Sequence, residues 1–232
     1  MTENSKISII IPTFNEAANI ASAIASTEPS RNVELIIVDG GSTDNTVSIA
    51  QALGVKVIIS PPGRAVQMNI GAMAATGDIL LFLHADTRLP CGFENMIRSA
   101  LKQPGIVAGA FTLRIDAPQW SLRWVETGVK WRSQLWQMPY GDQAIFLTKQ
   151  TFDNIGKFPE LPIMEDFELI RRLKHTGKIA VIPASVVTSS RRWLQKGVIY
   201  TTLLNQIIII AYFLGISPQR IRHWYRQPQK PS

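Results

Sequence analysis

The chain has 232 residues, of which 46% are apolar and 18% are charged, and its net charge is +7. This composition provides a core for one large domain or two small ones and excludes an intrinsically disordered protein. Cys91 is the only cysteine, which excludes an intrachain disulfide and suits a reducing compartment. Because the opening segment MTENSK is polar and has no apolar signal sequence, we expect a cytoplasmic protein.

The first part of the chain alternates between short apolar, β-branched runs and stretches with helical patterns. Runs of this kind are typical of parallel strands that are covered on both faces, so the alternation predicts βαβ units. Ser42 and Thr43 are candidate N-caps of the second helix, and Gly77 is a candidate C′ residue of the third. The predicted strands span 7–11, 34–38, 55–59 and 79–83, and the predicted helices span about 17–26, 43–53 and 65–76.

After Pro90 the alternation loosens, although further elements are still recognisable. Four tryptophans at helical spacing predict core packing, with carbohydrate stacking or membrane contact as the alternative. Pro183 indicates an edge or a bulge in the last strand. We expect helices near 92–102 and 165–177, strands at 106–115, 143–147 and 179–187, and the tryptophans are Trp120, Trp124, Trp131 and Trp136.

Polar segments follow three of the predicted strands. They read PTFNE (12–16), DGGSTDNT (39–46) and HADT (84–87). In an open α/β sheet, ligands bind beyond the carboxyl ends of the strands. If these strands are neighbours, Asp39 and Asp86 face one crevice.

The segments ISIIIPTFNE, LIIVDGGSTDNT, GDILLFLHADT and MEDFELIRRL, in this order and spacing, resemble inverting family 2 glycosyltransferases with the GT-A fold. The resemblance covers about residues 5–195. The stretch GRAVQMNIGAMAATGD (63–78) also resembles a bacterial and cyanobacterial subgroup whose genes lie near radical-SAM and selenoprotein genes. The resemblance implies an α/β fold with a Rossmann-like, mostly parallel central sheet and helices on both faces. It implies a domain at 1–195, with a nucleotide-binding half at about 1–90 and an acceptor half at about 91–195, before an apolar and basic helical extension at 196–232.

The resemblance further implies a UDP- or GDP-linked nucleotide sugar as the donor. Asp39 would accept hydrogen bonds from the nucleobase or ribose; the alternative is an Asp–Gly turn, with Asp44 capping the next helix. Arg64 precedes a helix, so its guanidinium and the helix N–H groups both suit a diphosphate. The donor-binding residues implied are Pro12, Thr13, Asn15, Glu16, Asp39, Arg64, Asp86 and Arg192.

The segment HADT stands where the family usually has Asp-x-Asp, which implies a divalent cation, Mn²⁺ or Mg²⁺, at the diphosphate. Asp86 matches the last carboxylate of that pattern and is the expected metal ligand. His84 departs from the pattern. Its imidazole either joins the shell of a Mn²⁺ ion or is a histidine satisfied at the end of the strand.

The segment MED (164–166) implies that Asp166 is the general base, with Glu165 beside it. The alternative is that these acidic residues complement the dipole in the first turn of a helix. SSRRW (189–193) resembles the Arg-Trp element of the family, although Ser189 stands at its Gln position. Arg192 and Trp193 would therefore contact the donor or the acceptor, unless the arginine pair lies on a solvated face. Asp142 in YGDQ is a candidate for the acceptor pocket.

The C-terminal stretch is both apolar and basic. No charge occurs between Lys196 and Arg220, and no Asp or Glu occurs between Arg171 and Lys230. Polar residues fall on one side of the expected helix: Thr201, Thr202, Asn205 and Gln206. The pattern favours contact with an inner membrane surface or a second copy through 198–226, over ordinary packing or true spanning.

We therefore expect metal-assisted transfer of a sugar, with inversion, to a hydroxyl of an unknown acceptor. One alternative is a nucleotidyltransferase that makes a nucleotide sugar, but PTFNEAAN lacks the Gly-rich basic loop typical of that class. Another is a catalytically silent protein that binds a nucleotide sugar or acts as a membrane scaffold. We do not expect nucleic-acid binding, because the basic excess comes without a recognisable reading motif.

Overall fold

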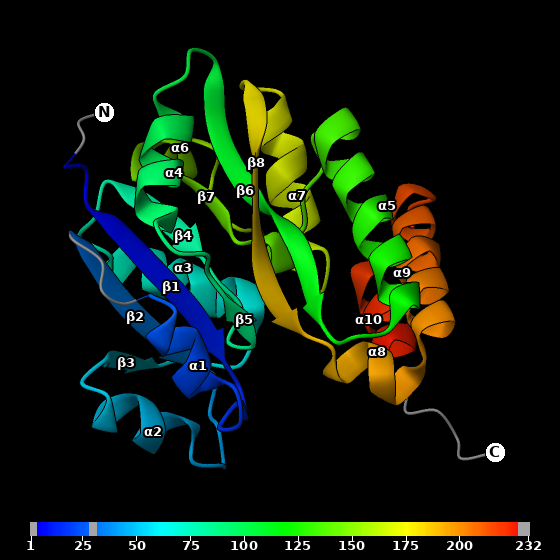
Figure 1. Cartoon of the computed structure of the whole chain (residues 1–232), viewed down its shortest axis with the longest axis horizontal. Helices are drawn as coiled ribbons and strands as arrows, with labels where there is room; N and C mark the ends of the chain where they lie inside the picture. Colours follow the sequence, from blue (N-terminus) through cyan, green and yellow to red (C-terminus); the bar gives the residue numbers. More distant parts are fainter. Residues whose placement is uncertain (1–3, 28–31, 227–232) are drawn as a thin grey trace.

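A single eight-stranded sheet runs through the protein, as the computed structural model in Figure 1 shows. The structure describes residues 4–27 and 32–226, without the side chain of Arg226; residues 1–3 of the opening segment and 227–232 of the expected extension, including Lys230, lie outside this description. The strands are β1 (Ile7–Thr13), β2 (Val33–Asp39), β3 (Lys56–Ile59), β4 (Ile79–Phe82), β5 (Thr87–Arg88), β6 (Ile106–Asp116), β7 (Ile145–Thr148) and β8 (Lys178–Ser189).

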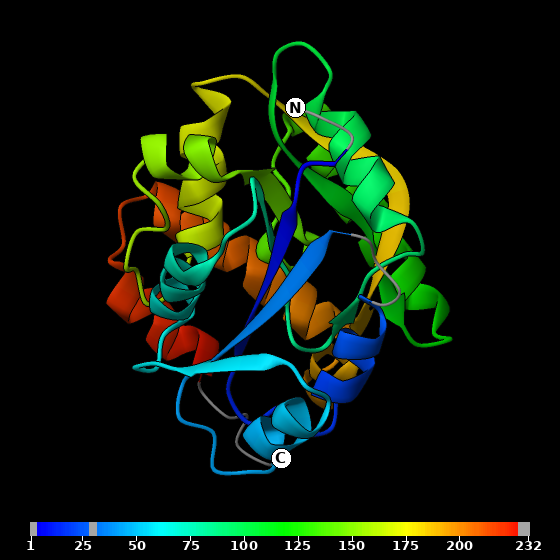
Figure 2. The same cartoon turned by 90° about the vertical axis from the view of Figure 1, so that its left-hand side faces the viewer.

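Helices cover both faces of this sheet, and Figure 2 shows α3 on one side of β1 and β2 with α1 and α2 on the other. The helices are α1 (Ile20–Ala25), α2 (Thr46–Ala52), α3 (Arg64–Ala74), α4 (Phe93–Leu101), α5 (Trp120–Trp136), α6 (Lys149–Asn154), α7 (Glu165–Lys174), α8 (Arg191–Lys196), α9 (Val198–Phe213) and α10 (Pro218–Arg226), with a 3₁₀ turn η1 at Gly141–Gln143.

The strand order is β3-β2-β1-β4-β7-β6-β8-β5. Strands β1 to β4 are mutually parallel, as the βαβ pattern predicted. Strand β7 then runs antiparallel to β4 and β6, while β6 and β8 are parallel. The α/β prediction with a mostly parallel sheet is confirmed, and the change of direction between β4 and β7 joins its two halves.

The central strands are continuous apolar runs because helices bury both of their faces. Every residue of β1 and β4 is buried. Ile9 and Ile11 belong to the core cluster under α1 and α4, whereas Ile10 belongs to the cluster under α3 and α7. Alternate side chains therefore enter opposite cores, and this is why a polar–apolar alternation is missing from the sequence.

Two predicted helix ends are wrong. Helix α2 begins at Thr46 after Asn45, so Ser42 and Thr43 are not its N-caps but lie in the loop before it. Helix α3 ends at Ala74, and Gly77 is not its C′ residue. A Cβ on Gly77 would lie 2.5 Å from Ser8 Oγ, so this glycine allows the chain to enter β4 directly against β1.

The bulge predicted at Pro183 is confirmed. Strand β8 pairs Ile182 with Phe111 and then Ser185 with Thr112, so two of its residues face no partner in β6. Thr112 Oγ1 donates a 2.9 Å hydrogen bond to the carbonyl oxygen of Ala184, which satisfies part of the interrupted ladder.

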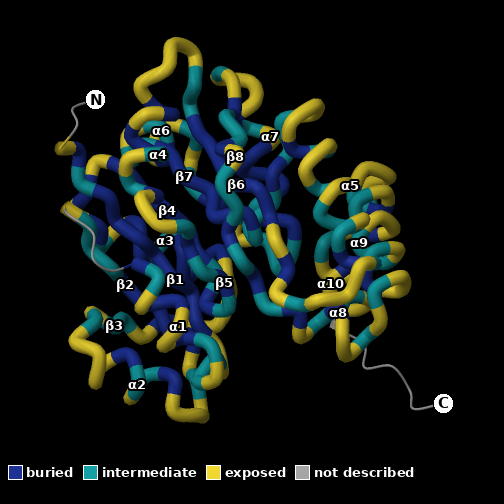
Figure 3. Tube along the Cα trace, viewed as in Figure 1, coloured by how far each residue is buried: buried dark blue, intermediate teal, exposed yellow. Residues whose placement is uncertain are grey.

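The prediction that the four tryptophans of α5 pack in the core is also wrong. Trp120, Trp124, Trp131 and Trp136 are between 65% and 75% exposed. Helix α5 instead turns Leu122 toward the sheet, and its outer side remains open in the burial view of Figure 3.

The three C-terminal helices lie beside α5 at the end of the molecule farthest from β3, and α9 contacts α8, α10 and α5. Ile208 and Ala211 of α9 and Ile221 of α10 form a buried cluster with Met164 and Phe167. Within residues 4–27 and 32–226, none of the helices combines the length and the apolar character needed to cross a membrane.

Candidate active site

A cleft of about 820 Å³ opens at the carboxyl ends of β1 and β4. It continues into an inner pocket of about 270 Å³ between β4, η1, α7 and the C-terminal helices. Arg64, His84 and Asp86 line both spaces. Of the other predicted site residues, Pro12, Thr13, Glu16 and Glu165 line the cleft, Asp142, Asp166, Arg192 and Trp193 line the inner pocket, and Asn15 and Asp39 line neither.

Arg64, the first residue of α3, is held between the two acidic residues of the MED segment. Its Nε donates a 2.5 Å hydrogen bond to Glu165 Oε1, and its Nη2 lies 4.0 Å from Asp166 Oδ2. Burial lowers the pKa of Arg64, but the negative charges of Glu165 and Asp166 outweigh this effect and keep the pKa above its usual value. Since 42% of the arginine side chain is exposed, a permanent positive charge faces the cleft.

Asp166 is fixed by two backbone N–H groups. Gly141 N donates to its Oδ2 and Phe167 N to its Oδ1, both at 2.7 Å. A Cβ on Gly141 would lie 2.9 Å from Asp166 Oδ2 and 3.0 Å from His84 Nε2. The absence of a side chain at position 141 therefore allows the imidazole and the carboxylate to meet over the backbone of η1.

His84 is a neutral imidazole at physiological pH. Burial lowers its pKa, and the nearby Arg64 guanidinium lowers it further, to about 3, although Asp166 acts in the opposite direction. A neutral ring nitrogen can accept a hydrogen bond or bind a metal ion.

Asp86 presents a desolvated carboxylate to the cleft. Burial raises its pKa, and Glu16 raises it further, whereas Arg191 lowers it. Thr87 Oγ1 donates only a long 3.4 Å hydrogen bond to Asp86 Oδ1. Arg191 itself is bound to Glu16, with 2.7 Å between Nη2 and Oε1. Arg191 thus balances the charge of two carboxylates, Glu16 and Asp86, and an added cation would reduce the repulsion between them.

Asp86 fits a metal site that the protein shares with the phosphates of a ligand, rather than a site formed by protein side chains alone. Among the residues that the structure describes, no three His, Cys, Asp or Glu side chains are grouped closely enough to hold a metal ion. Mg²⁺ and similar ions at phosphate sites are commonly held by one or two carboxylates together with the phosphates of the ligand. Asp86 meets that requirement.

Asp39 is buried behind the cleft and organises the loop after β2. Its Oδ2 accepts hydrogen bonds from Gly41 N at 2.9 Å and Ser42 N at 2.7 Å. Its Oδ1 accepts hydrogen bonds from Ser42 Oγ at 2.5 Å and Thr13 Oγ1 at 3.1 Å. These four bonds use the four lone-pair positions of a carboxylate.

Asn15 connects the loops that follow β1 and β2. Its side-chain oxygen accepts a 2.8 Å hydrogen bond from Thr43 N, and its backbone N–H donates a 2.8 Å hydrogen bond to Ser42 Oγ. Its backbone is left-handed, with φ of 55°, a conformation that asparagine tolerates better than most residues. Asn15 therefore shapes the rim of the cleft from outside.

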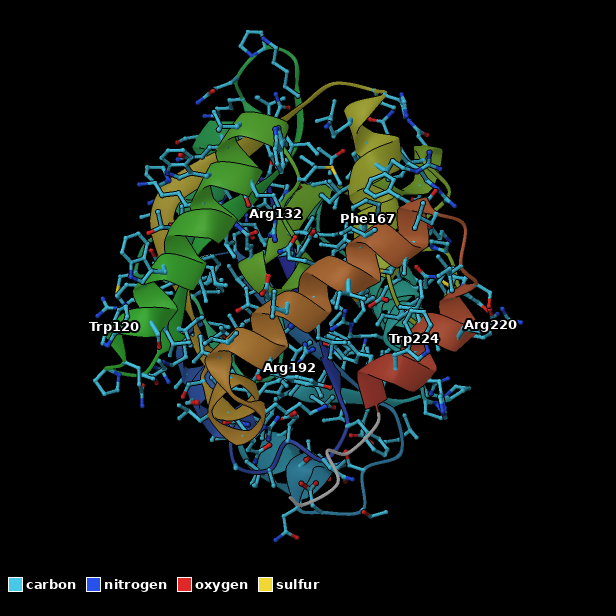
Figure 4. The ribbon with its side chains drawn as sticks, turned by 90° about the vertical axis from the view of Figure 1, so that its right-hand side faces the viewer. Trp120, Arg132, Phe167, Arg192, Arg220 and Trp224 are labelled. Carbon is cyan, nitrogen blue, oxygen red and sulfur yellow. The ribbon has the colours of Figure 1, made fainter. Side chains whose placement is uncertain are left out.

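Two buried polar atoms at the inner pocket have no hydrogen-bond partner among the described residues, Asp142 Oδ1 and Trp193 Nε1. Burial raises the pKa of Asp142 to about 6. Arg192 closes the opposite side of the pocket. Its Nη2 donates a 3.1 Å hydrogen bond to Asn205 Oδ1, and its guanidinium carbon lies 3.9 Å from the centre of the Tyr225 ring. In Figure 4, Arg192 lies beside α9.

Several residues of the site were absent from the predicted set. Phe14 lines the cleft with 55% of its surface exposed, and Arg191 is the arginine that approaches Asp86. Phe14 lies in the segment PTFNE and Arg191 in SSRRW. An aromatic residue among the polar residues after a predicted strand was the signal that could have identified Phe14. Tyr225 lines both spaces from α10, and nothing in its local sequence indicates that position.

Relatives of known sequence match part of this chain. An uncharacterized glycosyltransferase of Rickettsia felis is 45% identical over 95 residues, which cover 40% of this chain and 32% of that protein. The uncharacterized glycosyltransferase YibD of Escherichia coli is 30% identical over 144 residues, or 57% of this chain and 39% of that protein. A PGL/p-HBAD biosynthesis glycosyltransferase of Mycobacterium bovis is 44% identical over 91 residues, or 35% of this chain and 36% of that protein. The matched part thus spans about a third of these relatives.

Solved structures resemble a larger share of the chain. Mannosyltransferase PcManGT from Pyrobaculum calidifontis, in complex with GDP-Man and Mn²⁺, superposes with a TM-score of 0.63 at 20% identity over 79% of this chain and 56% of that one. S. aureus TarS 1–349 with UDP-GlcNAc gives 0.63 at 19% identity, over 79% of this chain and 58% of that one. At these identities the likeness establishes the GT-A fold.

The family model of glycosyl transferase family 2 matches residues 8–158, a stretch that runs from β1 through the cleft-lining tip of β4 to the segment after β7. That stretch is well over half of the chain, and the chain belongs to glycosyl transferase family 2.

Proposed function

We propose that this protein transfers a sugar from a nucleotide sugar to an acceptor hydroxyl, with inversion at the anomeric carbon. The observation that carries the proposal is the convergence of three distant segments at one point. Arg64, His84 and Asp86 line the cleft and the inner pocket alike, and Asp166 lies beside them. The cleft can then hold the donor and the inner pocket the acceptor, with the reacting atoms where the two spaces join.

The donor diphosphate would lie against Arg64 and the first N–H groups of α3, where a permanent positive charge and a helix N-terminus act together. Pro12, Thr13, Phe14 and Glu16 line the same cleft on the side of β1. Since Phe14 is exposed there, we propose that its ring stacks on the nucleobase.

Asp39 would bind the nucleobase or ribose after a local rearrangement. Its lone pairs are used within its own loop, but two of the donors are the rotatable hydroxyls of Ser42 and Thr13. Rotation of either hydroxyl would free one oxygen position for the nucleoside. The GDP-Man and UDP-GlcNAc complexes of the structural neighbours support a nucleotide sugar as ligand, and the donor nucleotide is either UDP or GDP in this proposal.

Asp86, with His84 close by, would hold Mn²⁺ or Mg²⁺ together with the diphosphate. A divalent cation bound there supplies positive charge that stabilises the departing nucleoside diphosphate. Arg64 adds a charge that requires no metal. Glu165 keeps the guanidinium oriented, because it occupies Nε and leaves the terminal nitrogens for phosphate oxygens.

Asp166 would act as the general base. As the acceptor oxygen attacks the anomeric carbon from the face opposite the diphosphate, its proton passes to Asp166. The bond from the anomeric carbon to the diphosphate oxygen breaks, and the electron pair leaves with the nucleoside diphosphate. Gly141 N–H and Phe167 N–H fix the carboxylate for this step. Asp142 and Trp193 are proposed to contact the acceptor, because each has a polar atom at the inner pocket for which the described residues offer no hydrogen-bond partner.

The variant Asp166→Asn tests this assignment. Removing a general base should lower transfer, or donor hydrolysis with water as acceptor, by a factor on the order of a hundred or more. Calorimetric binding of UDP or GDP with Mn²⁺ should stay near the wild-type value, because Asp166 does not line the cleft. Asp153→Asn is the matched control, since Asp153 is 50% exposed on α6.

Three outcomes would contradict the proposal. Full turnover by Asp166→Asn would remove this residue from the mechanism. Release of pyrophosphate from a sugar phosphate and a nucleoside triphosphate would identify a nucleotidyltransferase. Metal-dependent nucleotide binding with neither donor hydrolysis nor transfer to any hydroxyl compound supplied would identify a silent binding protein.

A further inference from the structure

Two neighbouring helices present apolar stripes to solvent. On α5 the stripe consists of Trp120, Trp124, Trp131 and Leu135, each at least 65% exposed. On α9 the exposed residues recur at the same helical spacing. They are Ile199, Leu203, Ile207, Ile210 and Phe213, with Leu214 directly after the helix, each at least 52% exposed. We call these ten residues the outer apolar face.

The two stripes lie on the same side of the molecule. Figure 1 places α5 and α9 next to each other at the edge farthest from β3, and Figure 4, turned toward that edge, has both helices at the front. The two helices also contact each other. The large exposed side chains of the two helices are thus gathered on one side of the molecule, and exposed apolar surfaces of this kind mark interaction sites.

The inner sides of both helices are already occupied. Helix α5 packs Leu122, Val125 and Val129 against the core. Helix α9 turns two polar residues inward beside Ile208 and Ala211: Thr201 is fully buried, and Asn205 accepts a hydrogen bond from Arg192. Unlike an ordinary surface helix, α9 therefore buries polar groups on its inner side while most of its large apolar side chains remain outside.

The charges around the outer apolar face decide between a lipid surface and a second copy. Lys130 on α5 and Arg220 on α10 are exposed, and Figure 4 shows Arg220 at the rim. The sequence has no Asp or Glu after Glu168, and Glu126 of α5 is engaged with Arg123 and Ile115 N. In a two-fold dimer this patch would face itself, so basic groups would oppose basic groups. An anionic lipid surface complements them.

The dimensions and composition also favour a bilayer surface. Helix α9 has 16 residues, or about 24 Å at 1.5 Å per residue, which is short of the roughly 30 Å of a hydrocarbon core. Tryptophan is enriched where membrane meets water, because its ring is amphipathic. We propose that the outer apolar face binds the surface of a bilayer containing anionic lipid, with α5 and α9 lying in the plane of the interface.

This placement would bring the inner pocket close to the membrane. Asn205, Ile208 and Ile209, on the inward side of α9, line that pocket. One helix, about 10 Å thick, would then separate the pocket from the headgroups. The lipid contact itself depends on the outer side chains alone and is independent of the proposed glycosyl transfer.

The test is flotation of the full-length protein with two kinds of vesicle, phosphatidylcholine alone and phosphatidylcholine mixed with phosphatidylglycerol. The wild type should float with the mixed vesicles, with a blue shift of its tryptophan emission, and added salt should weaken the binding. The double variant Trp124→Ser/Trp131→Ser should partition at least about tenfold less, because it loses two large rings that the bilayer would bury. Its melting temperature should stay near that of the wild type, since both side chains are exposed.

The matched control is Ile59→Ser/Met73→Ser. Ile59 and Met73 are 65% and 69% exposed on β3 and α3, away from the outer apolar face. This control should float like the wild type. The proposal is overturned if the wild type floats with neither vesicle, if both double variants lose flotation equally, or if the wild type is a dimer that the tryptophan variant converts to a monomer without vesicles.

Discussion

At the scale of single residues, Asp142 combines a pKa raised by burial to about 6 with a buried carboxyl oxygen that has no hydrogen-bond partner in the described part of the chain. Its ordinary value is 3.8. Between these values the folded protein holds a proton that the unfolded chain has released. The stabilisation that Asp142 contributes is therefore complete below about pH 3.8 and is lost as the pH rises through about 6.

We expect Asp142→Asn to remove this dependence. The free energy of unfolding of the wild type, relative to the variant, should fall by up to roughly 3 kcal/mol from acid to neutral pH, because one unit of pKa corresponds to about 1.4 kcal/mol. Chemical denaturation of both proteins across this range measures the difference. A constant difference would mean that Asp142 titrates normally in the fold.

The residues that the motifs predicted differ in how far their side chains could be foreseen. Arg64, Asp86 and Asp166 meet because their strand-tip and helix-start positions bring the backbone there. The hydrogen bonds of Asp39 could not be foreseen, since Thr13 comes from another strand and the loop conformation decides which donors reach the carboxylate.

At the scale of elements, helix α3 is pressed closely onto the sheet at Gly71. A Cβ there would lie 2.4 Å from Ile10 Cγ2 and 3.0 Å from Val38 Cγ2. Both of these side chains are fully buried, so they have little room to move. The glycine thus fixes the distance between α3 and the strands, and with it the position of Arg64, about two helical turns away.

Gly71→Ala should destabilise the fold by about 1–3 kcal/mol, which is typical of overpacking a dense core. It should also weaken the binding of UDP or GDP, because the displaced helix moves Arg64. Denaturant titration and calorimetry measure the two effects. Met73→Ala on the same helix is the control and should change neither, since Met73 is 69% exposed; unchanged stability of Gly71→Ala would show that α3 moves freely on the sheet.

The elements themselves were predicted unevenly, for a physical reason. The parallel strands β1 to β4 stand out because complete burial demands a continuous apolar run. Helix α5 was misjudged because two of its sides are apolar: the stripe of Leu122, Val125 and Val129 and the stripe of tryptophans have the same period. Periodicity reveals a stripe, but the choice of which stripe faces the core depends on volume and shape.

At the scale of the whole molecule, the C-terminal helices complete the site. Ile221 of α10 is fully buried against Met164 and Phe167, the residues on either side of the two acidic residues of the MED segment. The same helix carries Arg222 and Tyr225 to the cleft. A link between residues 164–167 and the last helix could not be predicted from either segment alone, because only the tertiary fold brings them together.

Ile221→Ala should loosen this link. Truncating a buried isoleucine costs about 2–5 kcal/mol, and here the cost should fall on the docking of α10. The KM for the nucleotide sugar, or the Kd for UDP and GDP, should rise because Arg222 and Tyr225 are less often in place. His223→Ala, an exposed position on α10, is the control. An Ile221→Ala protein with wild-type affinity would exclude α10 from donor binding.

The antiparallel pairing of β7 with β4 has an evolutionary consequence. Because the two strands run in opposite directions, the residues before β7, rather than those after it, stand beside His84 and Asp86. During evolution, the sequence of the short stretch from Gln137 to Ala144 could therefore change to suit a new acceptor, while the residues proposed to bind the nucleotide stay the same. Specialisation among such proteins should accumulate in that stretch, ahead of any drift in the β1 and β2 tips.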